Sequence, residues 1–133
     1  MIEHLDVGAG TSPHPDATKT MDARTDLDNI YYKGVDIQAD RWPIENNSVE
    51  RVTMMHVIEH LNPDNLEHVW KELSRILAPG GIANVHTPHI GTFAVGRNPN
   101  HRALGGFSLE LGQYLAGERP KWGSPPDWSV DYW

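Results

Sequence analysis

Residues 62–86 read NPDNLEHVWKELSRILAPGGIANVH, and this stretch decides the fold class of the chain. Its first three residues supply a helix cap, a proline suited to a first helical turn, and an acid at the positive end of the helix dipole. Apolar residues then recur at spacings of three and four on one stripe: Leu66, Val69, Trp70, Leu73, Ile76 and Leu77. The pattern predicts a helix that the PGG sequence at residues 79–81 ends, followed by a strand over residues 82–86.

Four short apolar runs precede this stretch, and each ends in residues typical of turns. They predict strands over residues 4–8, 18–22, 32–37 and 51–55. Strands that alternate with helical segments are typical of an α/β protein with a mostly parallel sheet. After residue 88 the composition shifts towards Gly, Pro, Asn and Trp, and only a short helix over residues 108–115 and a strand over residues 128–133 are indicated. We therefore expect an α/β fold with a sheet of five or six strands.

The length of 133 residues allows one compact domain and is too small for separate cofactor and substrate domains of ordinary size. We expect a single domain over residues 1–133, with a core over residues 4–89 and a variable segment over residues 90–133. No internal repeat is present to suggest a repeat architecture.

Charge and composition exclude several classes of protein. The formal net charge is −7 and the 11 Lys and Arg residues are scattered, which disfavours nucleic-acid binding. The absence of cysteine excludes disulfides, thiolate zinc sites and cysteine nucleophiles. No apolar run approaches the roughly 20 residues that span a bilayer, and the first residues lack the basic and apolar parts of a signal peptide. We expect a cytoplasmic protein that binds neither nucleic acid nor membrane.

A glycine-rich turn follows the first predicted strand. Residues 5–10 read LDVGAG, a G-x-G pattern that lets the backbone turn tightly and approach a ligand without interference from a Cβ atom. The third glycine of the dinucleotide fingerprint is absent, and Pro13 and Pro15 disfavour a helix start that holds a pyrophosphate. This turn alone is a weak signal, and it disfavours NAD binding.

Four segments, taken in order along the chain, point to a known family. They read LDVGAG at residues 5–10, ADRWPIENNSV at 39–49, HVIEHL at 56–61, and LSRILAPGG at 73–81 with NVHTPH at 84–89. In this order they resemble the class I S-adenosylmethionine-dependent methyltransferases, in particular those with a type 11 methyltransferase domain. The resemblance covers residues 4–89, about two thirds of the chain. It implies a Rossmann-like, mostly parallel sheet with S-adenosylmethionine as the cofactor.

The resemblance also implies which residues bind this cofactor. It places Gly8 and Gly10 against the methionyl part, with Asp6 helping to shape the turn. An acidic residue that ends the second strand then accepts hydrogen bonds from the ribose hydroxyls, a charge-assisted pairing. Asp22 and Asp36 compete for this role, and the short spacing from Asp36 to the next motif favours Asp22.

The segment at residues 39–49 implies contacts to the adenine. By resemblance, Asp40 accepts a hydrogen bond from the adenine amino group, while the Arg41 backbone and the Trp42 side chain border the ring. The alternative for Asp36 is an exposed loop carboxylate, and the alternative for Asp22 is a plain turn aspartate.

The HVIEHL segment contains the candidate catalytic residues, His56 and His60. The same H-x-x-E-H spacing occurs in inverted zincins, but here it lies at a strand end and Pro63 follows, so we expect no metal site. In the methyltransferase interpretation His56 lies beside the sulfonium, where an imidazole can orient an acceptor or remove its proton. The alternative is that His56 only lines the cofactor site and that Glu59 and His60 fix the loop. Further histidines are possible acceptor-side groups: His86, His89 and His101.

The chain departs from the family pattern in its short early connections. Only about ten residues separate Gly10 from the second predicted strand, whereas a parallel crossover needs about a dozen or more. The next connection, residues 23–31, is shorter still. We therefore expect a trimmed fold in which the early helices are reduced or missing. Because parallel strands are usually covered on both faces, we expect a second copy of the chain or the Trp-rich tail to supply the cover, giving a homodimer.

Two functions remain open at this point. The first is a methyltransferase that acts on a small-molecule or glycan acceptor, because the acidic chain lacks a surface for nucleic acid. The second is a degenerate domain that binds the cofactor or a protein partner without catalysis, which the loss of the early helices favours.

Overall fold

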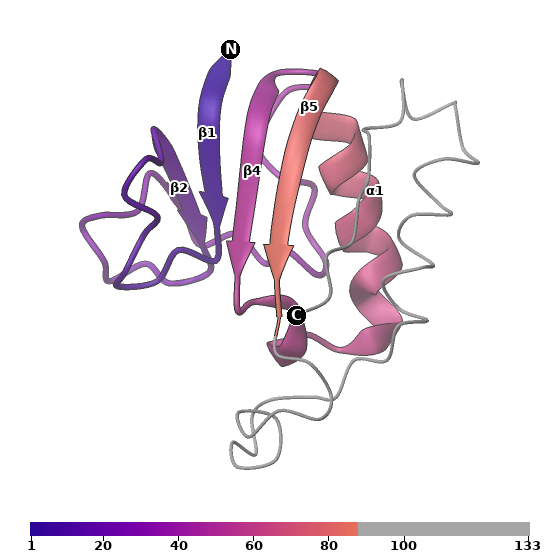
Figure 1. Cartoon of the computed structure of the whole chain (residues 1–133). Helices are drawn as coiled ribbons and strands as arrows, with labels where there is room; N and C mark the ends of the chain where they lie inside the picture. The colour runs from indigo at the N-terminus through magenta and orange to yellow at the C-terminus, as the bar shows by residue number, and fades with distance from the viewer. Residues whose placement is uncertain (88–133) are drawn as a thin grey trace.

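The computed structural model describes residues 1–87 and shows a parallel α/β sheet with one long helix (Figure 1). The elements, in chain order, are β1 (Ile2–Val7), β2 (Lys19–Asp22), β3 (Tyr32–Lys33), β4 (Val49–Met55), two 3₁₀ turns η1 (Ile58–His60) and η2 (Pro63–Asn65), α1 (Leu66–Ile76) and β5 (Leu77–His86). The sheet has five strands in the order β3-β2-β1-β4-β5, and every pairing is parallel. These positions match the first five strands of a doubly wound Rossmann sheet, so the predicted fold class is confirmed. The predicted helix over residues 108–115 and strand over residues 128–133 lie outside the described residues.

A strand is present near each of the five predicted ranges, but the lengths differ from the prediction. The strand predicted over residues 32–37 comprises only Tyr32–Lys33, because Gly34 turns the backbone into the left-handed region at φ +69°. After this turn the chain crosses to α1, and its apolar residues join the core instead of the sheet: Val35, Ile37, Trp42 and Ile44.

The helix begins and ends differently from the prediction. Asn62 caps a 3₁₀ turn through its side chain, whose Oδ1 accepts the Asp64 N–H at 3.1 Å, and α1 begins only at Leu66. The helix ends at Ile76, before the PGG sequence, because Leu77 is already extended and pairs with Val49. The next pair is Arg51 with Ile82, so the PGG sequence forms an irregularity within β5.

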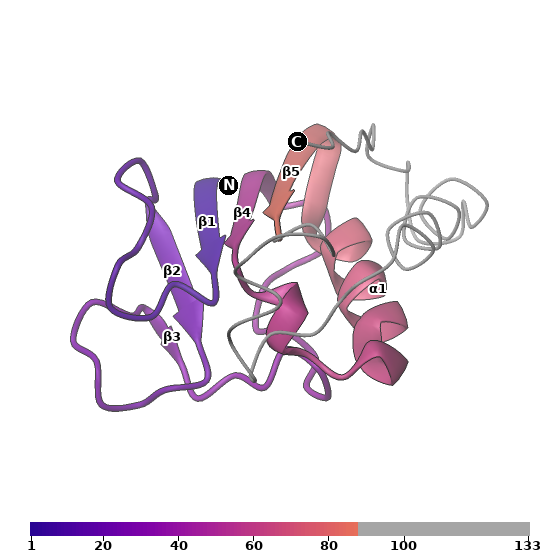
Figure 2. The same ribbon diagram turned by 60° about the horizontal axis from the view of Figure 1, so that its bottom comes forward.

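The apolar stripe of α1 packs on one face of the sheet. Its buried residues are Leu66, Val69, Trp70, Leu73 and Ile76. They form one core cluster with the apolar side chains of β1, β2 and β4. In Figure 2, α1 and the loop between β3 and β4 lie on the same side of the sheet. Within residues 1–87, no helix has the length and apolarity needed to cross a membrane.

The opposite face of the sheet is polar around β1, where a doubly wound fold ordinarily has a covering helix. Asp6 is in register with Thr20 on β2 and Thr53 on β4, so these three side chains share that face, and all are buried. The connections after β1 and β2 contain no helix, which confirms the reduced early helices. The loop after β1 covers Asp6 instead, because the His14 N–H donates to Asp6 Oδ2 at 2.7 Å. Polar strand residues with hydrogen-bond partners therefore remove the need for an apolar helix at this place.

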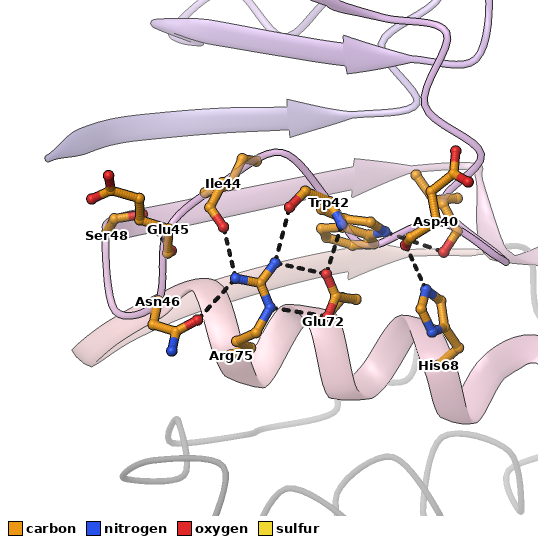
Figure 3. Close-up of polar contacts among 10 residues, drawn as sticks. Asp40, Trp42, Ile44, Glu45, Asn46, Ser48, His68, Glu72 and Arg75 are labelled. Atoms are coloured by element: carbon orange, nitrogen blue, oxygen red, sulfur yellow. Dashed lines mark hydrogen bonds and ion pairs between the residues drawn. The ribbon is translucent and has the colours of Figure 1, made fainter.

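A buried ion pair fastens the segment before β4 to α1 (Figure 3). Arg75 contacts Glu72 at 2.7 Å and also donates to the carbonyl oxygens of Trp42 and Ile44. Glu72 in turn accepts the Trp42 N–H at 2.8 Å. Burial of Glu72 opposes its ionisation, but the hydrogen bonds from Arg75 and Trp42 and the charges of Arg75 and His68 outweigh burial and lower its pKa. The loop that follows β3 is thus held to the helix by bonds to its main chain.

Candidate functional site

The candidate site lies at the carboxyl ends of β1, β2 and β4. The chain leaves β1 towards β2 on one side, and β4 lies on the other side of β1, so the strand order reverses there. Open α/β sheets bind ligands at such a point, outside the carboxyl ends of the strands. The loop from Gly8 and the loop from His56 start at this edge.

Gly8 allows these two loops to touch. Its φ is +71°, and a Cβ added there would lie 2.5 Å from Cγ2 of Val57. Its N–H donates to the carbonyl oxygen of Met21 at 2.8 Å, which ties the turn to β2. The need for glycine at this position is therefore explained by packing within the chain itself.

Gly10 differs from Gly8 because it faces open space. Its φ is +54°, and an added Cβ would meet no atom of residues 1–87 within 4 Å. Its N–H donates to Asp22 Oδ2 at 2.9 Å, and its carbonyl oxygen accepts from the Asn29 side chain at 2.8 Å. The backbone of Gly10 is thus held from both ends and exposes a surface without a side chain, as a close-fitting ligand requires.

Asp22 ends β2 beside this glycine. Its Oδ2 accepts the Gly10 N–H and its Oδ1 accepts the Arg24 N–H at 2.9 Å. A carboxylate has about four acceptor sites, so each oxygen retains one for a further donor. The structure thus brings Asp22, which the sequence favoured over Asp36, next to the glycine turn.

Asp6 lies beneath the turn and is 3% exposed. Its Oδ1 accepts the Thr53 hydroxyl at 2.7 Å and its Oδ2 accepts the His14 N–H at 2.7 Å. Because the Thr53 proton is given to Asp6, the His4 Nε2 atom, 3.1 Å from the same hydroxyl, acts as the donor to it. This chain of bonds joins β1 and β4 to the loop after β1, so Asp6 shapes the loop from within.

His4, at one end of this series of hydrogen bonds, makes the stability of the protein depend on pH. Burial, aided by the charges of Arg51 and His14, outweighs the hydrogen bond with Asp16 and the charge of Asp6 and lowers the pKa of His4 below 6.5. Below its ordinary pKa the unfolded chain binds more protons than the folded one, so this contribution to stability is complete above about pH 6.5 and declines as the pH falls towards the folded-state pKa. The midpoint of thermal unfolding should therefore drop between about pH 7.5 and about pH 5.5.

A matched variant tests this expectation. His4→Gln keeps a donor for Thr53 and removes the titrating group, so its midpoint should drop less over the same range. An equal drop in both proteins would show that His4 is not the cause.

The residues predicted to surround the adenine lie in the loop after β3. Asp40 is exposed, and its Oδ2 accepts the Asp36 N–H at 2.9 Å. Asp36 is exposed as well, and Arg41 lies next to Asp40 on the surface. Trp42, by contrast, is only 1% exposed, and its Nε1 donates to the carbonyl oxygen of Ile37 at 3.2 Å. The indole belongs to the core, so we correct the expectation that it borders the adenine.

The histidines of the HVIEHL segment lie directly after β4. His56 follows the last strand residue and His60 ends η1, with side chains 62% and 42% exposed. Both imidazoles approach the buried Glu59, at 3.7 Å from His56 Nδ1 and 3.8 Å from His60 Nε2. Residues 1–87 contain no group of three or more His, Cys, Asp or Glu residues arranged to hold a metal.

The three histidines predicted to lie on the acceptor side add little to the description of the site. The main chain of His86 accepts the His56 N–H at 2.8 Å, whereas His89 and His101 lie outside the described residues.

The sequence did not point to three residues that contact the predicted site. Val57 packs against Gly8, Asn29 binds Gly10, and Thr53 binds Asp6. The strand register brings Thr53 to Asp6, and loop packing brings Val57 and Asn29 to the two glycines, so no local pattern in the sequence signals these contacts.

Comparisons with known proteins agree with this geometry. A family model described as a methyltransferase domain matches residues 8–85. No curated protein sequence matches the chain significantly.

Solved structures share the fold at low sequence identity. A SAM-dependent methyltransferase from Archaeoglobus fulgidus has a TM-score of 0.68 and 15% identity over 84% of this chain and 60% of its own. The YcgJ protein from Bacillus subtilis has a TM-score of 0.58 and 16% identity over 84% of this chain and 61% of its own. A protein from Pyrococcus horikoshii has a TM-score of 0.59 and 18% identity over 84% of this chain and 53% of its own.

These matches define the family and its extent. At such identities the structures show the fold, and the chain spans between 53% and 61% of the three proteins. The cofactor of the family is S-adenosylmethionine. Because the family model covers more than half of the residues, the chain belongs to the methyltransferase-domain family, and its fold is that of class I methyltransferases.

Proposed function

We propose that the chain binds S-adenosylmethionine at the carboxyl edge of the sheet and transfers its methyl group to a small-molecule or glycan acceptor. The observation that carries the proposal is the Gly10 backbone, which faces open space while Asp22 and Asn29 hold it in place. A ligand with an amino-acid end and a ribose diol needs an open backbone beside a carboxylate. The pair of Gly10 and Asp22 offers both.

Each proposed contact has a chemical reason. Gly8 and Gly10 receive the methionyl part, and Asp6 keeps their turn in shape from beneath. Asp22 accepts from the ribose hydroxyls with the acceptor sites that Gly10 and Arg24 leave free. Asp40 accepts from the adenine amino group, and the Arg41 backbone borders the ring. We leave the Trp42 side chain out of this site because it is buried.

The reaction would depend mainly on placement of the acceptor. When bound, S-adenosylmethionine supplies an electrophilic methyl carbon attached to a sulfonium. The protein then has to hold the nucleophile in line with the leaving sulfur and exclude competing geometries. His56 and His60 are the candidate catalytic residues, because they lie in the segment after β4 whose Val57 contacts Gly8. The net charge of −7 supports a small or glycan acceptor over a polyanion.

The alternative function is a degenerate domain that binds the cofactor or a protein partner without catalysis. The connection after β1 favours it, because this connection contains no helix. Calorimetric titration with S-adenosylmethionine and with S-adenosylhomocysteine tests cofactor binding, which the methyltransferase and the cofactor-binding form of the alternative share. Saturable heat with both ligands supports cofactor binding. If neither ligand gives heat, only the protein-binding alternative remains.

We also retain the homodimer as a proposal, together with a cytoplasmic location. On the polar face of the sheet, Met55 and Ile82 are 39% and 53% exposed, and they lie on the adjacent strands β4 and β5. A second copy that covers them would bury apolar surface. Light scattering at micromolar concentration should therefore give the mass of a dimer, and Ile82→Lys should shift it towards the monomer. A monomer mass for the unmodified chain would contradict this proposal.

A further inference from the structure

His56 occupies an unusual backbone position at the candidate site. Its φ is +56°, a left-handed conformation that is unfavourable for a residue with a Cβ atom. The bond from its N–H to the His86 carbonyl oxygen, 2.8 Å long, holds it there by extending the pairing of β4 with β5. Strained positions of this kind cluster at functional sites, where the surrounding structure maintains them.

Glu59 contributes a buried carboxylate directly beside this histidine. The residue is 0% exposed, and its Oε2 accepts a hydrogen bond from the Thr87 hydroxyl at 2.9 Å. Its Oε1 is buried and has no hydrogen-bond partner within residues 1–87. Buried polar atoms are nearly always hydrogen-bonded, so an exception calls for an explanation.

Two histidines approach Oε1 within 4 Å. His56 Nδ1 lies at 3.7 Å and His60 Nε2 at 3.8 Å, slightly too far for hydrogen bonds. In ligand-free sites such contacts are often long, and they shorten when the ligand binds. Of the two imidazoles, His56 is the more exposed, and it is the one that follows β4 directly.

We infer that Glu59 is a positioning residue, which holds His56 with its Nδ1 proton towards Oε1 and leaves the lone pair on Nε2. This inference rests on the proposed function, in which His56 faces the acceptor. A carboxylate that accepts from one ring nitrogen fixes the tautomer of an imidazole, and the other nitrogen then acts as the base. The acceptor class follows, because a base is useful only where the nucleophile carries a proton, as in a hydroxyl or an amine.

The proton and electron balance of the step is simple. His56 Nε2 takes the proton of the acceptor's O–H or N–H group. The lone pair of that oxygen or nitrogen forms the bond to the methyl carbon, while the carbon–sulfur bond breaks and its electrons remain on sulfur. The imidazolium that results is stabilised by Glu59, and it later returns the proton to water.

The tautomer of His56 tests this inference without an acceptor. Long-range proton–nitrogen NMR correlation distinguishes the two neutral tautomers at about pH 8, where an ordinary imidazole is neutral. The signals of His56 are assigned by their loss in His56→Asn. We expect the Nδ1–H tautomer to be the major form in the unmodified protein and the minor form in Glu59→Gln.

Matched measurements make the outcome decisive. Glu67→Gln removes a half-exposed carboxylate on α1 and should leave the His56 tautomer unchanged. A major Nε2–H form in the unmodified protein would overturn the inference, even if Glu59→Gln failed to fold, and so would an unchanged tautomer in folded Glu59→Gln. The absence of S-adenosylmethionine binding in calorimetry would contradict the proposed function alone, since the tautomer measurement involves no cofactor.

Discussion

Arg75→Ala is expected to lower the free energy of unfolding by about 3 kcal/mol. The guanidinium bonds to Glu72, to the carbonyl oxygens of Trp42 and Ile44, and to the Asn46 side chain (Figure 3). Its loss leaves the Glu72 carboxylate buried without its charge partner, which is the costly way to break an ion pair. Urea unfolding measures the change through the midpoint at constant slope.

The control for this prediction lies on the same helix. Lys71 pairs with Glu67 at 3.0 Å, but both side chains are more than a third exposed. Lys71→Ala should therefore cost about 0.5 kcal/mol or less. Equal losses in the two variants would mean that burial of the Arg75 pair does not determine its contribution.

Gly10→Ala is expected to weaken cofactor binding strongly while lowering stability only modestly. The new Cβ enters the open space where we place the ligand, and the left-handed backbone costs a residue with a Cβ atom about 1–2 kcal/mol. The methyl group of the new alanine cannot move away from the ligand, because hydrogen bonds hold the N–H and the carbonyl oxygen of residue 10 in place. Calorimetric titration with S-adenosylmethionine should detect at least a hundredfold loss, which corresponds to about 2.8 kcal/mol.

Gly80→Ala separates the ligand effect from the backbone effect. Gly80 has φ +79° and open space at its Cβ position, as Gly10 has, but it lies near the start of β5, at the edge of the sheet opposite the site. Both variants should lose similar stability, and only Gly10→Ala should lose binding. Equal affinities would contradict the assigned site. Gly8 is unsuitable for this test, since any side chain there collides with Val57 before it meets a ligand.

The sequence predicted the sheet well because its local patterns agree with the fold. The alternation around Leu5 and Val7 and the stripe from Leu66 to Ile76 are set by burial against each other, and both appear in the core. The strand over residues 32–37 was predicted too long because its apolar residues, Val35 and Ile37, pack into the core outside the sheet. A periodic pattern of apolar residues indicates that they are buried, but it does not identify the element against which they pack.

The candidate site was predicted less completely than the sheet. Gly10 follows β1 and Asp22 ends β2, and parallel strands bring their carboxyl ends to one edge, so their proximity was expected. Trp42 was misplaced because its aromatic ring suits both a ligand and a core, and its burial and the bond from its Nε1 to Ile37 place it in the core. The contacts of Glu59 with Thr87 and of Gly8 with Val57 join loops that are distant in sequence, and only the tertiary structure reveals them.

The most direct measurement of the central claim is a titration of the nitrogen-labelled protein with S-adenosylmethionine, followed by amide NMR. The account predicts saturable shifts at the carboxyl edge of the sheet, with the amides of Gly10, Asp22 and His56 among the largest. Amides at the opposite edge, such as Gly80, should remain unchanged. Saturable shifts confined to that opposite edge, or no saturable shift at all, would contradict a cofactor site at the glycine turn.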